Sequence, residues 1–264
     1  MIDTHTHLYM DEFVADNPEG AACAVDRALE AGVSRMLLPA VDRESVALIL
    51  DLHSRRKECI SVALGLHPTE VGEDWKEELR EITDSLLPLG PVAVGETGLD
   101  LYWSSENLDL QKEAFVAQLL LAKKLNLPVI IHCRQAIEEC CGCIADARKL
   151  VPEETLTPLV FHSFTGSADD VRRIRQVCDP YFGINGVVTF KNAASLPDAV
   201  REIGLDRLLL ETDSPFLAPV PKRGRRNESS YIIYVNDKIA EILGVPPEEV
   251  DAVTSRNANI LFKF

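Results

Sequence analysis

The alternation of short apolar runs with helical segments is the feature of this sequence that narrows the choice of fold. Stretches such as Val129-Ile130-Ile131 and Leu208-Leu209-Leu210 are continuously apolar, as expected for parallel strands that are buried on both faces. We predict strands at residues 2–7, 35–41, 60–67, 91–96, 127–132, 159–162, 181–185 and 207–213. The segments between them, at 18–31, 45–57, 75–86, 111–125, 136–150, 169–177 and 196–203, have the pattern of helices.

Eight strand-and-helix units in 264 residues fit a TIM (β/α)8 barrel, which is an α/β fold. A doubly wound sheet is the main alternative, but no Gly-x-Gly-x-x-Gly turn follows the first strand, which disfavours it. With 46% hydrophobic residues, the chain can bury one large core. Because we find no internal repeat and no linker, we expect residues 1–264 to form a single domain.

Residues able to bind metal or to transfer protons stand at the ends of six predicted strands: His5, His7, His67, Glu96, His132, His162 and Asp213. Five of the six histidines belong to this set, and only His53 does not. The carboxyl ends of TIM-barrel strands converge on one face, where active sites are built. Each histidine alone could be a core or capping residue. Burying the whole set without a cation would be costly, so the set predicts a metal centre.

The spacing along the strands refines this prediction. His5 and His7 are two residues apart, which places both on one face of a strand. Val94 shares the face of Glu96, so the glutamate would top an apolar inward column. A pair of divalent cations bridged by one carboxylate would offset the cost of burial.

Two further carboxylates fit an outer shell around such a centre. Asp3 precedes His5 and Glu211 precedes Asp213, each by two residues on the same strand. Metal-bound histidines usually donate their second ring N–H to such groups. The alternative is that both merely keep the strand ends hydrated.

Charge and cysteine content bear on partners and location. The net charge of −15 repels polyanions and anionic membranes, so a nucleic-acid substrate would need a local basic patch or a metal ion. Seven cysteines in no regular framework indicate reduced thiols and a cytoplasmic location. No apolar run approaches the roughly 18 residues of a membrane span, and the candidate ligands at residues 5 and 7 leave no room for a cleaved leader. We expect a monomer with no membrane association and no obligate protein partner.

Three basic residues are candidate substrate contacts. Arg134 shares the face of His132 one step above it, where it could reach a phosphate or form a salt bridge at the barrel rim. Lys191 follows the seventh strand, and Arg223 belongs to a basic run that follows the eighth, where TIM barrels often bind phosphate. Such a run, here Lys222, Arg223, Arg225 and Arg226, is also typical of a solvated loop.

The cysteine cluster Cys140-Cys141-Gly142-Cys143 could suggest a site for a soft metal. It falls on a predicted helix outside the barrel and has no nearby histidine. We therefore interpret these residues as ordinary helix thiols.

Six segments resemble, in the same order, the signature motifs of the TatD family of metal-dependent deoxyribonucleases. They are Asp3–His7, Gly65–Pro68, Val94–Asp100, Leu127–Arg134, Phe161–Gly166 and Glu211–Pro219. The resemblance extends from Ile2 to Phe262 and so covers nearly the whole chain. Thr69 is a departure, because the family commonly has a second histidine there, and the Leu101–Trp103 stretch lacks a basic residue often found nearby.

The resemblance implies an amidohydrolase-type barrel with a phosphodiesterase site that uses two divalent cations. By motif, one cation would be held by His5, His7, Glu96 and Asp213, and the other by Glu96, His132 and His162, with Glu96 bridging. His67 would have a catalytic or phosphate-contacting role. Four imidazoles favour zinc, manganese, cobalt or nickel over magnesium by ligand type. Magnesium, manganese and zinc remain the candidate ions.

The expected chemistry follows from these residue types. Water held between two cations loses its proton near neutral pH, and Asp213 is placed to accept that proton as a general base. We therefore predict a deoxyribonuclease that releases nucleotides from an end of DNA, with RNA as a possible substrate. The alternative is a hydrolase of a small amide, lactone or phosphoester, because activated water does not choose the electrophile. A third hypothesis is a non-catalytic metal or nucleic-acid binding protein, against which the complete ligand set with Asp213 argues.

Overall fold

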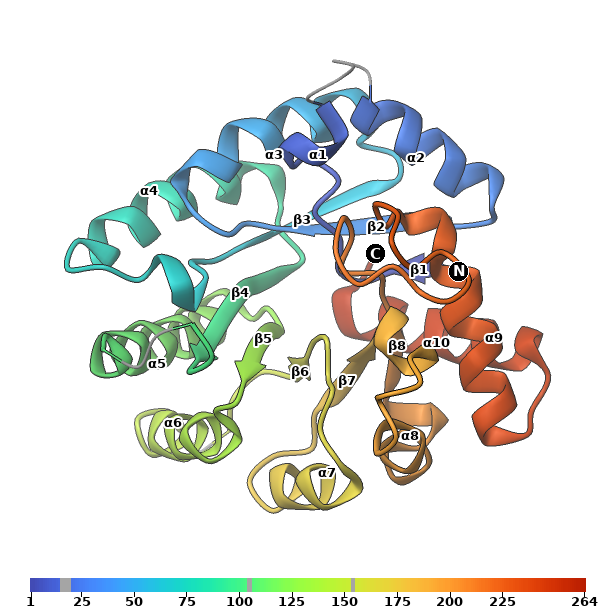
Figure 1. Ribbon diagram of the computed structural model, residues 1–264. Helices are drawn as coiled ribbons and strands as arrows, with labels where there is room; N and C mark the ends of the chain where they lie inside the picture. Colours follow the sequence, from blue (N-terminus) through green and yellow to red (C-terminus); the bar gives the residue numbers. More distant parts are fainter. Residues whose placement is uncertain (15–19, 104–105, 153–154) are drawn as a thin grey trace.

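A sheet of eight parallel strands forms the centre of the computed structural model, which describes residues 1–14, 20–103, 106–152 and 155–264. Each strand pairs with the next one in the sequence (Figure 1). The strands are β1 Ile2–Asp3, β2 Arg35–Pro39, β3 Ile60–Leu64, β4 Ala93–Asp100, β5 Val129–Arg134, β6 Leu159–Phe161, β7 Tyr181–Ile184 and β8 Leu208–Leu210.

The first and last strands meet just beyond their ends, and this seam completes the barrel. The amide of Thr4 donates to the carbonyl oxygen of Leu210 over 3.1 Å, and the amide of Asp213 donates to the carbonyl oxygen of His5 over 2.9 Å. The predicted TIM barrel is thereby confirmed.

Helices lie outside the strands and form a ring around them (Figure 1). They are α1 Asp11–Val14, α2 Gly20–Glu30, α3 Arg43–Arg56, α4 Trp75–Leu86, α5 Leu108–Leu125, α6 Ile137–Lys149, α7 Ala168–Arg175, α8 Leu196–Ile203, α9 Ile232–Leu243 and α10 Pro247–Phe262. The predicted helices agree with α2 to α8 to within a few residues. The predicted start of the first helix, at Pro18, lies outside the described residues.

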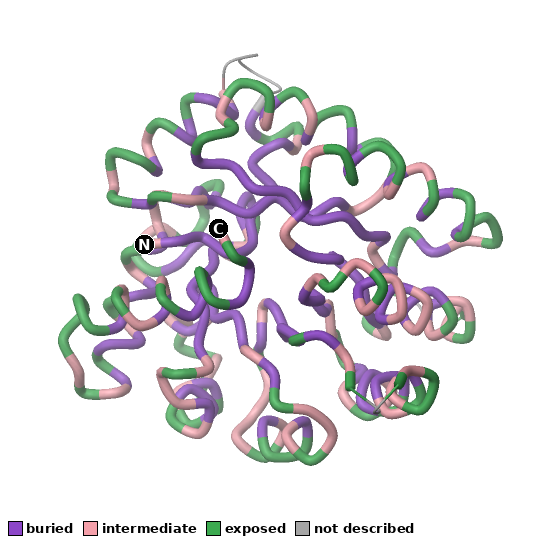
Figure 2. The backbone as a smooth tube through the Cα atoms, turned by 180° about the vertical axis from the view of Figure 1, so that it is seen from behind, coloured by how far each residue is buried: buried purple, intermediate pink, exposed green. Residues whose placement is uncertain are grey.

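Apolar residues are buried in two layers, one inside the barrel and one between the strands and the helices. Seven of the eight strands each contribute one buried side chain to the inner layer, and the partly buried Tyr181 of β7 packs against it; the seven are Ile2, Leu37, Ala63, Ala93, Ile130, Val160 and Leu209. Leu261 and Phe262 of α10 pack against this layer. Figure 2 shows the result as buried strands surrounded by helices whose outward faces are exposed. The inner layer makes the barrel a packed core, so a site can form only at its ends.

Two further expectations can be compared with the structure. All seven cysteines are unpaired thiols, and Cys140, Cys141 and Cys143 lie buried on α6, outside the barrel, as predicted. In the part of the chain that the structure describes, we find no helix that is both long and apolar enough to cross a membrane.

Candidate metal centre

A cavity of 550 Å³ opens at the carboxyl ends of the strands. Most of the predicted metal-binding residues line it: His7, His67, Glu96, His132, His162 and Asp213. The side chain of His5 is fully buried beside them, 3.1 Å from Glu96. The fold therefore brings together all seven residues that the sequence singled out.

Glu96 lies at the middle of this group, and its two carboxylate oxygens face different imidazoles. Oε2 lies 3.1 Å from Nε2 of His5 and 3.7 Å from Nε2 of His7. Oε1 lies within 3.3 Å of a ring nitrogen of each of the other three histidines, His67, His132 and His162. One carboxylate thus divides the five imidazoles into two sets, as a bridging ligand between two cations would.

Asp213 completes the first of these sets. Its Oδ1 lies 3.5 Å from Nε2 of His7 and 3.8 Å from Nε2 of His5. The residue adopts φ of 55°, a left-handed conformation that is unfavourable for a residue other than glycine and is often found at functional sites. The hydrogen bond from its amide to His5 at the barrel seam helps to hold it there.

The irregular course of β4 explains how Glu96 reaches this position. The sequence predicted that the strand would end at Glu96, but β4 continues to Asp100. Its register against β5 shifts between Val94 and Thr97. Such an irregularity can redirect one side chain without ending the strand, and here it falls at the glutamate.

The ring nitrogens themselves fit divalent cations. Nε2 of His5 lies 3.1 Å from Nε2 of His7, and Nδ1 of His132 lies 3.2 Å from Nε2 of His67 and 3.4 Å from Nε2 of His162. These nitrogens point toward one another and toward a carboxylate, which can only accept while it is ionised. Cations placed among them would satisfy lone pairs that otherwise face other lone pairs. The residues present therefore fit a bound metal.

The pKa values within the centre follow from burial and mutual charge. Burial alone would raise the pKa of Glu96, but the charges of His162, His5 and His67 hold it well below its usual range. Burial similarly opposes ionisation of Asp213, whose pKa is nonetheless lowered by its hydrogen bond with His7 and the charge of His5. Burial, with the charge of His162, lowers the pKa of His5 to about 4. Both carboxylates are thus ionised, and His5 is neutral, at neutral pH.

Three of the imidazoles have an outer partner that fixes the orientation of the ring. Nδ1 of His7 lies 2.9 Å from the hydroxyl of Tyr9. Nε2 of His132 lies 2.9 Å from Oδ2 of Asp100. Nδ1 of His67 lies 2.6 Å from the hydroxyl of Thr69, so the residue that departs from the family pattern contacts a residue of the centre.

Tyr9 and Asp100 are functional candidates that the sequence analysis did not identify. Their positions follow the same two-residue spacing that singled out the ligands, since Tyr9 is two residues after His7 and Asp100 is four after Glu96. Extending that spacing beyond the predicted strand ends would have found both.

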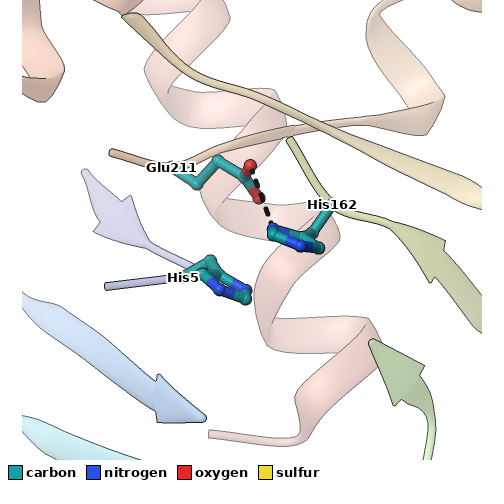
Figure 3. A group of neighbouring side chains, drawn as sticks. All are labelled: His5, His162 and Glu211. Atoms are coloured by element: carbon teal, nitrogen blue, oxygen red, sulfur yellow. Dashed lines mark ion pairs between the residues drawn. The ribbon is translucent and has the colours of Figure 1, made fainter. Parts of the chain in front are cut away.

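The two predicted outer-shell carboxylates have different surroundings. Asp3 does not face an imidazole: its oxygens accept hydrogen bonds from the amide and hydroxyl of Thr212, at 3.0 and 2.6 Å, and burial raises its pKa to about 6. Glu211 lies beside His162 (Figure 3), with Oε1 3.8 Å from Nδ1. Burial and the charge of Asp213 raise the pKa of Glu211 well above its usual range.

The rings of His5 and His162 stack at a centroid distance of 3.9 Å. Nδ1 of each ring and Oε2 of Glu211 are buried and have no hydrogen-bond partner among the residues that the structure describes. The other ring nitrogen of each histidine, Nε2, is the one that faces Glu96. Figure 3 shows how closely the three side chains gather.

Of the three predicted substrate contacts, only Arg134 lines the cavity described above. Its guanidinium lies over the rings of Tyr102 and Trp103, at 4.0 and 5.7 Å from their centroids. Lys191 is exposed outside the lining of this cavity, and Arg223 lies 3.9 Å above the ring of Phe190.

The other basic residues after β8 also contact aromatic rings. Lys222 lies 5.0 Å from the ring of Tyr231, and Arg226 lies 4.4 Å from the ring of Phe13. The loop that the sequence predicted to be solvated is thus held in part by contacts between its basic side chains and aromatic rings.

Comparison with known proteins gives consistent results. The family model described as TatD related DNase matches residues 2–263. The uncharacterized metal-dependent hydrolase YabD of Bacillus subtilis is 37% identical over 265 residues, covering 100% of this chain and 99% of its own. The similarly described YcfH of Escherichia coli is 37% identical over 218 residues, covering 80% and 78%. The crystal structure of the TatD homologue YjjV of Escherichia coli superposes with a TM-score of 0.86 at 29% identity, covering 100% of this chain and 98% of that one.

Proposed function

This chain belongs to the TatD family of metal-dependent hydrolases, and we propose that it hydrolyses DNA phosphodiester bonds with two divalent cations, from an end of the strand. The observation that carries the proposal is the division of five imidazoles between the two oxygens of Glu96. His5, His7 and Asp213 would hold one cation with Glu96, and His132 and His162 the other. Magnesium, manganese and zinc are the candidate ions.

When bound, the cations would supply a nucleophilic water at neutral pH and offset charge on the phosphoryl oxygens. The protein's own part is to place and ionise the groups around that water. Asp213 has a lowered pKa and keeps 14% of its side-chain surface exposed to the cavity side of the cluster. An ionised carboxylate in that position can accept a proton from water, so Asp213 is the general base in this proposal.

His67 is suited to contact the substrate as well as the centre. It is less buried than His5, at 13% side-chain exposure, and its Nε2 lies 3.3 Å from Glu96. Burial lowers its pKa, so the ring is neutral at pH 7. Its role would be to donate or accept a hydrogen bond at a phosphoryl oxygen or the leaving group.

Arg134, Tyr102 and Trp103 form a substrate-contacting rim on one side of the cavity. Tyr102 and Trp103 are 50% and 69% exposed, which is unusual for large aromatic residues that have no function at the surface. A guanidinium beside exposed rings suits a ligand that carries both phosphate and flat bases. Lys191 and Arg223 would act farther along the strand, by charge alone.

The alternative substrate is a small amide, lactone or phosphoester. Its support is the size of the cavity, since 550 Å³ falls within the usual range for small-molecule sites. The same water and the same ligands would serve either substrate class.

Digestion of end-labelled single-stranded DNA, with magnesium or manganese added, tests the proposal. The wild type should degrade the DNA, and Glu96→Ala and Asp213→Asn should each lose at least about 100-fold in rate, because each removes a group at the reacting centre. Asp84→Asn on α4, 68% exposed, is the control and should retain full activity. A ladder that shortens from one end indicates exonuclease action.

Intact DNA in the presence of metal-loaded wild type would contradict the nuclease proposal. Hydrolysis of small esters or amides by the same preparation, lost in Asp213→Asn, would then favour the alternative. RNA substrates of the same sequence test the choice of sugar.

A further inference from the structure

Asp100, at the end of β4, is 1% exposed and uses its two carboxylate oxygens for two different partners. Oδ2 lies 2.9 Å from Nε2 of His132. Oδ1 accepts hydrogen bonds from the backbone amides of Tyr102, at 2.9 Å, and Trp103, at 3.1 Å. A single side chain thus contacts both the metal centre and the rim that we assign to substrate.

The contact with His132 decides which of its nitrogens faces the centre. When Oδ2 of Asp100 accepts a hydrogen bond from Nε2–H of His132, the unprotonated Nδ1 faces Glu96, whose Oε1 lies 2.7 Å away. A metal-bound imidazole needs this arrangement, with one nitrogen donating to an outer acceptor and the other free to coordinate.

The hydrogen bonds from the backbone amides of Tyr102 and Trp103 to Oδ1 of Asp100 hold the turn that carries the rim. The rings of Tyr102 and Trp103 meet edge to face at 5.0 Å, and the guanidinium of Arg134 lies over both. Arg134 is also the register partner of Asp100 in the neighbouring strand. The turn is therefore attached to β5 at Arg134 and to the carboxylate at Asp100.

The backbone of Asp100 is itself held firmly. Its amide donates to Oε1 of Gln111 over 2.9 Å, and its carbonyl accepts from Nε2 of Gln111 over 3.3 Å. With the main chain fixed on both sides, a change at either carboxylate oxygen is passed to the other through rotation of one short side chain.

We propose that Asp100 is a positioning residue that couples cation binding at His132 to the order of the rim formed by Tyr102, Trp103 and Arg134. Cation binding would then prepare the substrate-contacting surface, and by linkage an ordered rim would favour the cation. The inference rests on the cation site of the proposed function and is independent of DNA as the substrate.

Only an aspartate of this reach satisfies both partners. An asparagine has one accepting oxygen, so it can face His132 or the two backbone amides, but not both. If its amide group donates to Nε2, His132 carries its proton on Nδ1, where the cation should bind. Asp100→Asn therefore alters the coupling while changing neither size nor shape.

The test follows Trp103, which becomes the single tryptophan when Trp75 is replaced by phenylalanine, since the chain has two. Zinc is titrated into metal-free protein while Trp103 emission and its quenching by acrylamide are recorded. We expect zinc to shift the emission and reduce quenching. In Asp100→Asn that response should be lost, and zinc affinity, measured by calorimetry, should fall about 10- to 100-fold. Asp109→Asn, an exposed aspartate on α5, should behave like the parent.

Unchanged zinc affinity in Asp100→Asn would overturn the proposal, as would a Trp103 response that survives in that variant or is missing in the parent. No DNA is used, so these outcomes are separate from failure of the nuclease assignment. If Trp75→Phe or Asp100→Asn does not fold, nitrogen-15 spectra of zinc-loaded wild type decide the matter. They should show the His132 proton on Nε2, and a proton on Nδ1 would contradict the proposal.

Discussion

Several residues around the centre each form a hydrogen bond with one ring nitrogen of a histidine. That bond determines which ring nitrogen is left to bind a cation. The hydroxyl of Tyr9 donates to the carbonyl oxygen of Pro39 over 2.8 Å, so its oxygen can accept a hydrogen bond from Nδ1–H of His7. That directs Nε2 of His7 toward Glu96 and Asp213. The hydrogen-bond acceptor outside the centre determines which ring nitrogen carries the proton, and the other nitrogen is then free to bind a cation.

Replacing Tyr9 with phenylalanine tests this argument. The change leaves the Nδ1 proton of His7 without its acceptor, so zinc affinity should fall about tenfold and the free energy of unfolding by about 1 kcal/mol. Calorimetry and urea denaturation measure the two effects. Tyr234→Phe, on α9, is the matched control, and equal effects in both variants would refute the assigned role of Tyr9.

Gly183 on β7 leaves the space that Glu211 occupies. A Cβ atom built on Gly183 would lie 1.9 Å from Oε2 of Glu211. Gly183→Ala should therefore displace Glu211 from the amide of Ser163, its partner at 2.5 Å, and destabilise the protein by about 1–3 kcal/mol through overpacking.

The control for that substitution lies in α6. A Cβ atom on Gly142 meets nothing within 4 Å, so Gly142→Ala should stabilise the protein by about 0.5–1 kcal/mol through its helix preference. Thermal unfolding of both variants gives the comparison. Similar shifts in melting temperature would mean that Glu211 moves aside without cost.

At the scale of single elements, the sequence predicted where strands lie better than where they end. β1 ends at Asp3 and β3 at Leu64, so His5, His7 and His67 follow their strands instead of ending them. Hydrogen bonding between neighbouring strands stops before the side chains cease to alternate in direction, and only that alternation can be inferred from a sequence. Tyr9 escaped notice for that reason, and Asp100 because β4 continues four residues beyond its predicted end at Glu96.

The loop after β8 is fastened to α2 by one ion pair. The guanidinium of Arg27 lies 2.6 Å from Glu228, whose side chain is 9% exposed. Burial alone would raise the pKa of Glu228, but Arg27 and Ser230 hold it below its usual value. A carboxyl group with a lowered pKa stabilises the fold above its unfolded pKa of about 4.3 and loses that contribution as the pH falls.

Glu228→Gln should therefore lower the free energy of unfolding by about 1 kcal/mol at pH 7 and make it less dependent on pH between about 5 and 3. Urea denaturation at several pH values measures both effects. Glu241→Gln, which changes a glutamate that is 70% exposed and pairs with Lys238, should alter neither. An unchanged pH dependence in Glu228→Gln would show that the pair adds nothing to acid stability.

At the scale of the whole molecule, the seam between β8 and β1 depends on a buried polar pair. The hydroxyl of Thr212 donates to Oδ2 of Asp3 across 209 residues of sequence. Thr212→Val would leave that carboxylate oxygen buried without its donor and should cost about 1–3 kcal/mol, measured by urea denaturation. Thr83→Val, which removes a hydroxyl bonded within α4, should cost less. Equal losses of unfolding free energy in the two variants would show that the hydrogen bond at the seam stabilises the protein no more than one within a helix.

The sequence predicted the barrel and the set of residues at its centre because both depend on repeated local patterns. It could not predict that Asp3 serves the seam instead of an imidazole, since that depends on how Thr212 meets it across the closed barrel. The stacking of Arg134 on Tyr102 was hidden for a similar reason. Contacts between loops that are far apart in the sequence depend on the assembled fold, so no periodic pattern in the sequence predicts them.

The seam also determines when, during synthesis, the barrel and its centre can be completed. The ribosome makes His5 208 residues before Asp213, whose amide donates to the carbonyl oxygen of His5. Until then the first strand has no neighbour on one side and the centre lacks its proposed base. A chain that stops before Asp213 would therefore lack the proposed base and the closing hydrogen bond of the seam, so hydrolysis should begin only after Asp213 has been made.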